Sequence, residues 1–306
     1  METFKILTKK MDERLTFKLS TIGWALSCDL FFSNRIPEIQ QNINLVNYLK
    51  NGDKIFIDVS PNELKINLNE LVDILQKNNV KVYLYLLYEP IVSINIINLL
   101  RPISLGFYLQ NNIYEDTLIH CMPIGIRDCE KVCPVHKGFS HDYLYNEGNK
   151  TVTKDNMCLL CFSYTHEERQ RCYNQLKNES FVKNLNDNSY EKQPSIHCGN
   201  VPVWINYEET HKSYYTLSPR GCGVDCHRFY EAIYLDSIPI VKRSNTVFDK
   251  MYNIFPCLIV NDWSDINEDL LLNNRDNCME KIRIFKCKYP NFLTDLDSIH
   301  ELLLQT

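Results

Sequence analysis

The sequence predicts an α/β protein in which two units, each with a mostly parallel sheet, follow one another along the chain. Three observations predict this class. Short apolar, β-branched runs alternate with segments whose apolar residues recur at helical spacing. The alternation stops near the middle of the chain and then begins again. The length of 306 residues suits two domains of roughly 150 residues better than one compact core.

The first half contains four strand-like runs and one clear helix. Residues 54–60, KIFIDVS, form a short β-branched run that ends in a Ser-Pro turn. Residues 62–78 carry leucines and isoleucines at helical spacing, which predicts a helix. Residues 80–88, VKVYLYLLY, predict a buried strand, and residues 103–109 and 118–124 predict two more. Strands that alternate with helices favour a parallel sheet with helices on both faces.

The second half repeats the pattern after a break at residues 128–155, where we expect a loop and an interdomain linker. We predict strands at 157–164, 195–199, 214–217, 238–242 and 257–260, and helices at 167–177, opened by Thr165, and at 225–235. The last apolar stripe predicts a terminal helix that packs back across the molecule. The expected division is an N-terminal domain at 1–150, a C-terminal domain at 151–290 and the terminal helix at 291–306.

Composition excludes several classes of protein. The formal net charge of −5 lacks the basic excess that a general nucleic-acid binder carries. The apolar run at 19–32 contains Asp29 and is too short to span a bilayer, so we expect no membrane span in this chain and a cytoplasmic protein. Without an export signal, the thirteen cysteines are expected to be free thiols.

The run from residue 214 to 241 carries the chemistry. A strand ends at Leu217 and is followed by a loop in which Gly221 and Gly223 would let the backbone approach a ligand. Asp225 is a plausible N-cap for the helix that follows. A strand, a glycine loop and a helix N-terminus in series predict an anion site, because free N–H groups and the helix dipole point to one place.

Charged side chains support this interpretation and also allow another. Arg220 and Arg228 lie in or beside the loop, and guanidinium groups bind phosphate oxygens bidentately. Glu231 follows Arg228 at i+3, so it lies on the same helix face and could accept from ribose hydroxyls. The alternative is a capped helix in which Arg228 and Glu231 pair with each other. Spacing alone leaves both interpretations open, and Gly-x-Gly by itself is a weak signal.

The segments LSPRGCGVDCHRFYEAIYLDSIPIV and FDKMYNIFPCLIVNDWSDI resemble the C-terminal signature of exostosin-like glycosyltransferases. The resemblance is strongest to the branch that includes the dystroglycan ribitol xylosyltransferase and related viral and protist proteins. It covers residues 218–266 closely, with looser similarity in FYLQNN, MPIGI and CFSYTHEER. It implies a GT-B fold, two facing Rossmann-like domains with the donor bound mainly to the second.

The resemblance also implies roles for individual residues. Arg220 and Arg228 would hold the diphosphate, Gly221 and Gly223 would donate N–H groups to it, and Glu231 would bind the ribose. The remaining donor-site residues, which would line or shape the loop, are Ser218, Asp225 and His227. Asp236 departs from the family pattern, which often has glycine at that position.

The implied activity is an inverting, metal-independent transfer from a nucleoside-diphosphate sugar, expected to be a UDP-sugar and by resemblance xylose, to a glycan or other hydroxyl acceptor. No cofactor or metal is expected. The alternative is an inactive sugar-nucleotide-binding protein. An inverting transfer needs a base from the first domain at the carboxyl end of a strand. The candidates are Asp29, Asp58, Glu89 and, nearer the cleft between the domains, Asp128.

Two metal-binding alternatives are weaker. The cysteines of Cys158-x2-Cys161 lie on a predicted strand, where positions i and i+3 point to opposite faces and cannot share a zinc ion. Cys129, Cys133 and His136 would have to supply the other ligands. The Asp-x-Asp pair of a metal-dependent transferase occurs once, at Asp295 and Asp297 in the predicted terminal helix, where solvated helix residues are the better interpretation.

Overall fold

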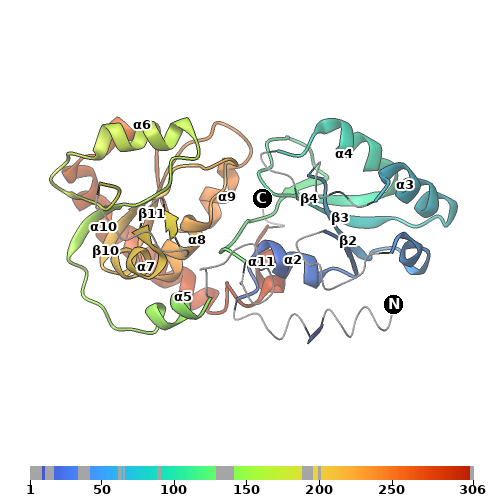
Figure 1. Ribbon diagram of the computed structural model, residues 1–306, viewed down its shortest axis with the longest axis horizontal. Helices are drawn as coiled ribbons and strands as arrows, with labels where there is room; N and C mark the ends of the chain where they lie inside the picture. Colours follow the sequence, from blue (N-terminus) through green and yellow to red (C-terminus); the bar gives the residue numbers. More distant parts are fainter. Residues whose placement is uncertain are drawn as a thin grey trace.

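The computed structural model describes residues 9–10, 17–33, 42–60, 64, 66–87, 91–128, 141–187, 196–198 and 201–303. Two five-stranded parallel sheets lie side by side in two lobes, with helices against their faces (Figure 1). Strands through Cys121 belong to the first sheet, and the second sheet begins at Asn156. This confirms the predicted α/β class with two Rossmann-like units, the arrangement of a GT-B fold. The domain boundary at residue 150 stays a prediction.

The strands of the first sheet lie in sequence order. They are β1 (Leu30–Phe32), β2 (Lys54–Asp58), β3 (Val82–Leu87), β4 (Ser104–Leu109) and β5 (Ile119–Cys121). Four of them were predicted, whereas β1 lies in the apolar run at 19–32, which the sequence analysis weighed only as a membrane segment. The same run contains α2 (Thr21–Ser27), which begins after Ser20 because the Ser20 hydroxyl caps the N–H of Gly23.

Helices cover both faces of the first sheet. The helix α3 (Leu68–Lys77) begins later than predicted because the Asn67 side chain caps the N–H groups of Asn69 and Glu70. The other elements are η1 (Ile43–Tyr48), α4 (Ile94–Leu100) and η2 (Arg101–Ile103). Figure 1 shows α3 and α4 on one side of the sheet and α2 and α11 on the other.

The last helix of the chain covers part of the second face of the first sheet. The helix α11 (Leu296–Leu303) packs on the first sheet, where the ring nitrogens of His300 lie 3.2 and 3.3 Å from the hydroxyls of Tyr85 and Tyr108. This confirms the predicted terminal helix that packs back across the molecule. It begins at Leu296, because the Asp295 carboxylate accepts the N–H groups of Asp297 and Ser298. Asp295 therefore caps the helix and does not lie within it.

The second sheet reverses its strand order once. Its strands lie in the order β12 (Leu258–Val260), β11 (Ile238–Lys242), β10 (Ser213–Leu217), β6 (Asn156–Leu160) and β7 (Val182–Asn184). The chain enters this sheet at the inner strand β6, moves to the edge strand β7 on one side and continues at β10 on the other. A crevice opens at such a reversal, between β6 and β10 at their carboxyl ends, and open α/β sheets bind ligands there. A small separate sheet pairs β8 (Ile196–Cys198) with β9 (Val201–Pro202).

The helices of the second unit correct two expectations. Part of the predicted loop at 128–155 forms α5 (His141–Gly148), which packs on α7 (Val203–His211), while 129–140 lie outside the described residues. His166 caps α6 (Glu167–Leu176), and Thr165 does not, because His166 Nδ1 accepts the N–H of Glu168. The remaining helices are α8 (His227–Tyr234), α9 (Asp249–Ile254), η4 (Trp263–Asp265) and α10 (Glu268–Lys288).

None of the helices that the structure describes has both the length and the apolar composition of a membrane span.

Candidate donor site

A cavity of about 310 Å³ opens at the reversal point of the second sheet. Its wall comes from the last residue of β11 and from the segments that follow β6, β10, β11 and β12, so every side chain in it stands at or beyond the carboxyl end of a strand. The lining residues are His166, Glu167, Glu168, Ser218, Arg220, Val224, Lys242, Arg243, Ser244, Tyr252 and Trp263. Of the predicted donor-site residues, Ser218 and Arg220 lie in this wall.

Arg220 is held in place by another arginine. The Nε of Arg169, on α6, donates to the carbonyl oxygen of Arg220 at 3.1 Å, and its Nη1 donates to the carbonyl and hydroxyl oxygens of Ser163. Arg169 therefore ties the loop after β10 to the loop after β6, across the crevice. The Nη2 of Arg220 donates to the carbonyl of Cys222 at 3.3 Å, whereas its buried Nε has no partner in the described chain. An unsatisfied guanidinium nitrogen beside a cavity is suited to an anionic ligand.

The charges of the cavity leave it electropositive. Glu168 lies in the wall, but its carboxylate contacts Arg171 at 2.7 Å and Lys242 at 3.3 Å. Burial raises the pKa of Glu168, but Lys242 and the remaining contacts lower it further, so this pKa lies below its usual range. The pKa of His166 is lowered, first by burial and then by the charge of Arg220, which keeps the imidazole neutral. The unneutralised charges are those of the guanidinium groups.

Arg243 supplies the second of these groups. Its side chain is exposed, and its Nε donates to Asn261 Oδ1 at 3.2 Å. In the part of the chain that the structure describes, neither Arg220 nor Arg243 forms a salt bridge. Two guanidinium groups that no described carboxylate neutralises therefore border one cavity, and guanidinium groups are well suited to phosphate oxygens.

The two loop glycines leave room for protein side chains, which differs from the expected role of approaching a ligand. A Cβ at Gly221 would come within 2.9 Å of Arg169 Nη2. A Cβ at Gly223 would collide with the side chain of Asn111, which follows β4 in the first unit. Glycine at 223 therefore permits close contact between the two units. Donation of N–H groups to a phosphate by either glycine stays a prediction.

Asp225 joins the two units and does not cap the helix, so the predicted N-cap was wrong. One carboxylate oxygen accepts the N–H of Ile124, from the first unit, at 2.8 Å, and the hydroxyl of Tyr230 at 2.7 Å. The other accepts the N–H of the next residue, Cys226, which is the N-cap. The N–H of Asp225 donates to Asn111 Oδ1 at 2.8 Å. Burial raises the pKa of Asp225 to about 7.

His227 makes a second bridge of this kind. Its Nδ1 donates to the carbonyl oxygen of Gly125 at 2.8 Å. Gly125 has a left-handed backbone with φ of 65°, which glycine adopts without strain, and a side chain there would collide with Leu19. Because residues 111, 124 and 125 follow β4 and β5, the carboxyl ends of the two sheets face each other.

Arg228 and Glu231 are buried and do not line the cavity. The guanidinium carbon of Arg228 lies 5.8 Å from the centre of the Phe162 ring, just beyond β6. Glu231 Oε1 accepts the hydroxyl of Tyr207, on α7, at 3.3 Å. Ser218, in contrast, lines the cavity and lies 3.1 Å from Cys226 Sγ at the start of α8, so this helix begins beside the cavity. The roles of Arg228 and Glu231 in donor binding stay predictions.

The base candidates occupy different edges of the first sheet. Asp58 ends β2 at the carboxyl edge, as predicted, and its buried carboxylate accepts the N–H of Ser60. Asp29 precedes β1 and accepts the N–H of Lys54, which starts β2, so it lies at the opposite edge and its predicted position was wrong. Asp128 is buried and accepts the N–H of Ile22 in the first turn of α2. Glu89 lies outside the described residues.

The positions of Cys158 and Cys161 do not favour a shared zinc ion. Cys158 and Cys161 belong to different buried clusters on the two sides of the second sheet, as the alternation along a strand predicts. Cys129, Cys133 and His136 lie outside the described residues.

Sequence reasoning missed most of the cavity wall. Lys242 and Arg243 end a predicted strand, and Trp263 stands in the quoted NDWSDI segment, so the rule that ligands bind at strand carboxyl ends could have found them. Arg169 ends the quoted CFSYTHEER segment, but its contact with Arg220 depends on the pairing of β6 with β10, which that segment does not indicate.

Comparison with known proteins gives a likeness of fold alone. An α,α-trehalose 6-phosphate synthase from Burkholderia multivorans is 13% identical, with a TM-score of 0.37 over 78% of this chain and 69% of that one. An α,α-trehalose-phosphate synthase (UDP-forming) from Burkholderia vietnamiensis is 11% identical, with a TM-score of 0.40 over 84% and 76%. A trehalose-6-phosphate structure from E. coli bound with UDP-2-fluoro glucose is 11% identical, with a TM-score of 0.37 over 84% and 72%. No protein-family model and no curated protein matches the chain, so the exostosin-like resemblance stays a prediction.

Proposed function

We propose that this protein is a glycosyltransferase that takes its sugar from a nucleoside-diphosphate sugar. One observation carries the proposal: the cavity at the reversal point of the second sheet is bordered by Arg220 and Arg243, whose charges no described carboxylate neutralises. A diphosphate carries two phosphate groups, each of which accepts paired hydrogen bonds from a guanidinium. The beginning of α8 beside Ser218 adds N–H groups and a positive helix end.

The proposed reaction is an in-line displacement at the anomeric carbon with inversion. Negative charge develops on the diphosphate as the sugar leaves, and fixed guanidinium groups stabilise it. The transfer is proposed to need no metal, because the sequence offers arginines beside the glycine loop, while Asp295 caps α11 and Asp297 lies in the first turn of that helix, on the first sheet. Membership of the exostosin-like family, a UDP donor and xylose as the sugar rest on the motif resemblance, as do donor contacts by Arg228 and Glu231.

The acceptor is proposed to enter between the two units. A second cavity, of about 380 Å³, is lined by the β4–β5 connection and by Val247 and Lys250 of the second unit. Ser244 lines the donor cavity, so the short segment 244–250 runs from one cavity to the other. His120 stands in this wall, and burial lowers its pKa, which favours the neutral imidazole that a general base requires. We add His120 to Asp58 as a candidate base.

The first experiment is donor binding by thermal shift with UDP, GDP and CDP. UDP at ~100 times its dissociation constant should stabilise the fold by roughly 2.7 kcal/mol. Arg220→Ala should abolish this shift, whereas Arg283→Ala, which removes an exposed arginine of α10 from outside the cavity, should retain it. No shift with any nucleoside diphosphate would remove the basis of the proposal.

The alternative function is a sugar-nucleotide-binding protein without transfer activity. Binding does not separate the two functions, but donor turnover does. Release of UDP from a panel of UDP-sugars, measured with and without small glycan acceptors, supports a transferase. Tight donor binding with no release under any condition supports the inactive protein.

A further inference from the structure

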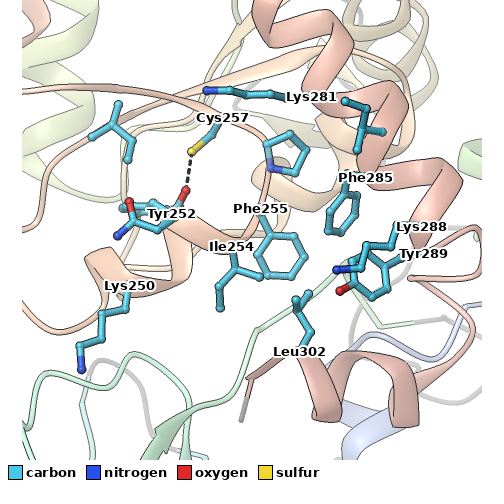
Figure 2. A pocket seen from close by; sticks show the side chains of 14 residues that line it. Lys250, Tyr252, Ile254, Phe255, Cys257, Lys281, Phe285, Lys288, Tyr289 and Leu302 are labelled. Atoms are coloured by element: carbon cyan, nitrogen blue, oxygen red, sulfur yellow. Dashed lines mark hydrogen bonds between the residues drawn. The ribbon is translucent and has the colours of Figure 1, made fainter. Parts of the chain in front are cut away.

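A third cavity, of about 810 Å³, lies outside the donor site, between α9, α10 and α11. Figure 2 shows the rings of Phe255, Phe285 and Tyr289 and the side chain of Leu302 gathered around it. The ring centres of Phe255 and Phe285 are 5.4 Å apart, and those of Phe285 and Tyr289 are 5.2 Å apart. The floor of the cavity is therefore a continuous aromatic surface.

The rim of this cavity is basic. Lys250, Lys281 and Lys288 line it, and its lining contains no aspartate or glutamate. This is unusual in a chain whose formal net charge is −5. Within the described residues, Lys281 and Lys288 form no salt bridge, and the Nζ of Lys288 lies 5.1 Å from the centre of the Tyr289 ring.

Other basic residues of α10 are paired with acids. Arg283 contacts Glu280 at 2.6 Å, and Lys286 contacts Asp236 at 2.6 Å. Neither lines the basic cavity. The basic side chains of α10 that point away from the cavity are therefore paired with carboxylates, whereas, among the described residues, those at the rim of the cavity are not.

The face of α10 that meets the cavity repeats this combination of apolar and basic groups. Lys281, Ile284, Phe285 and Lys288 follow one another at i, i+3, i+4 and i+7, so they share one face of the helix. Ile284 is 53% exposed between the two lysines. An exposed isoleucine flanked by unpaired lysines offers contact to an apolar group and charge to an acid group at the same place.

We infer that this cavity binds a small organic acid with an apolar body, of the kind represented by a medium-chain carboxylate. The apolar body lies on the aromatic floor and along Ile284, and the carboxylate contacts Lys281 and Lys288. The volume lies within the range of small-molecule sites. Because Tyr252 lines both this cavity and the donor cavity, the bound acid is a neighbour of the donor site. The inference does not depend on glycosyl transfer.

The test is calorimetric titration of the full chain with decanoate below its micelle concentration. Decanol and decyltrimethylammonium serve as neutral and cationic probes with the same apolar body. We expect saturable binding of one decanoate, weaker binding of decanol and none of the cation. Since the lysines are exposed, the affinity for decanoate should fall as sodium chloride is raised.

Variants locate the site. Lys281→Glu with Lys288→Glu should weaken decanoate binding on the order of tenfold or more, since each reversal replaces an attraction with a repulsion. Ile284→Ser should weaken decanoate and decanol alike. Lys77→Glu, which makes one such charge reversal at an exposed site on α3, should leave the affinity within twofold. Melting curves establish that each variant is folded.

Three results would overturn the inference. They are binding that does not saturate, equal binding of the cation, and a decanoate affinity that the double lysine variant leaves unchanged. Binding of an acidic amphipathic peptide where decanoate fails would also overturn it, because the occupant would then be a protein segment.

Discussion

Asp225 gives the sharpest prediction, because a carboxylate with three hydrogen-bond donors is also buried between the two units. Burial raises its pKa from the ordinary 3.8 to about 7. In the unfolded chain the group loses its proton near its ordinary pKa, while the folded protein holds the proton until about pH 7. The folded state therefore binds more protons across this window, and the free energy of unfolding falls as pH rises.

The magnitude follows from the shift. About three pKa units at 1.36 kcal/mol each correspond to roughly 4 kcal/mol of stability, present below the ordinary pKa and lost by pH 7. About 3 kcal/mol of this loss falls between pH 5 and pH 8. Asp225→Asn removes the titrating group while keeping its shape. Denaturant unfolding should find that the stability of the variant relative to the wild type rises by about 3 kcal/mol from pH 5 to pH 8.

The comparison needs a control for the loss of one acidic group. Asp73→Asn, at an exposed position of α3, makes the same change at the surface, and its stability relative to the wild type should be nearly independent of pH. If the stability difference between Asp225→Asn and the wild type is the same at pH 5 and at pH 8, the reasoning fails. The three donors would then outweigh burial, and Asp225 would be charged at neutral pH.

Three further predictions concern the donor loop and its mechanism. Arg228→Ala should lower turnover at saturating donor by about 100-fold, the effect expected when one charge-stabilising group is lost. Glu231→Ala should mainly raise the donor Michaelis constant. Steady-state kinetics distinguishes the two effects, and melting curves establish that both variants are folded, because both side chains are buried. Gly223→Ala should lower the free energy of unfolding by roughly 1–3 kcal/mol, measured by denaturant titration, because its Cβ would collide with Asn111. Transfer should survive EDTA, and full loss that manganese restores would assign a metal-dependent mechanism.

The sequence predicted best the elements whose signal is local. Residues 54–60 and 80–88 are apolar runs of strand length, and the structure places β2 and β3 inside them. The terminal helix that packs back across the molecule was predicted from one apolar stripe and was confirmed, and its His300 contacts Tyr85 and Tyr108. The strand β1 was missed because its three residues adjoin α2 in one apolar run. In such a run the spacing of apolar residues does not distinguish a strand from a helix. The helix α5 was missed because its apolar face is weak.

The residues of the candidate site also differ in whether their position depends on local sequence or on strand pairing. The strand, loop and helix at 213–234 are consecutive in the chain, so their order and the place of Arg220 in the cavity wall could be predicted. Lys242, Arg243 and Trp263 reach the same cavity from later strands, and only the pairing of β10 with β11 and of β11 with β12 brings them there. Single-sequence patterns carry little information about such pairing.

The loop glycines show why a motif can be found correctly and explained wrongly. A glycine-rich loop after a strand usually means that a backbone approaches a phosphate, and this was the expected reason for Gly221 and Gly223. In the structure their missing side chains make room for Arg169 and for Asn111, one from the same unit and one from the other. The loop is thus fixed from two sides, by Arg169 through the carbonyl of Arg220 and by Asn111 through the N–H of Asp225. These contacts fix the loop that carries Arg220 beside the cavity, and both partners come from outside the glycine loop itself.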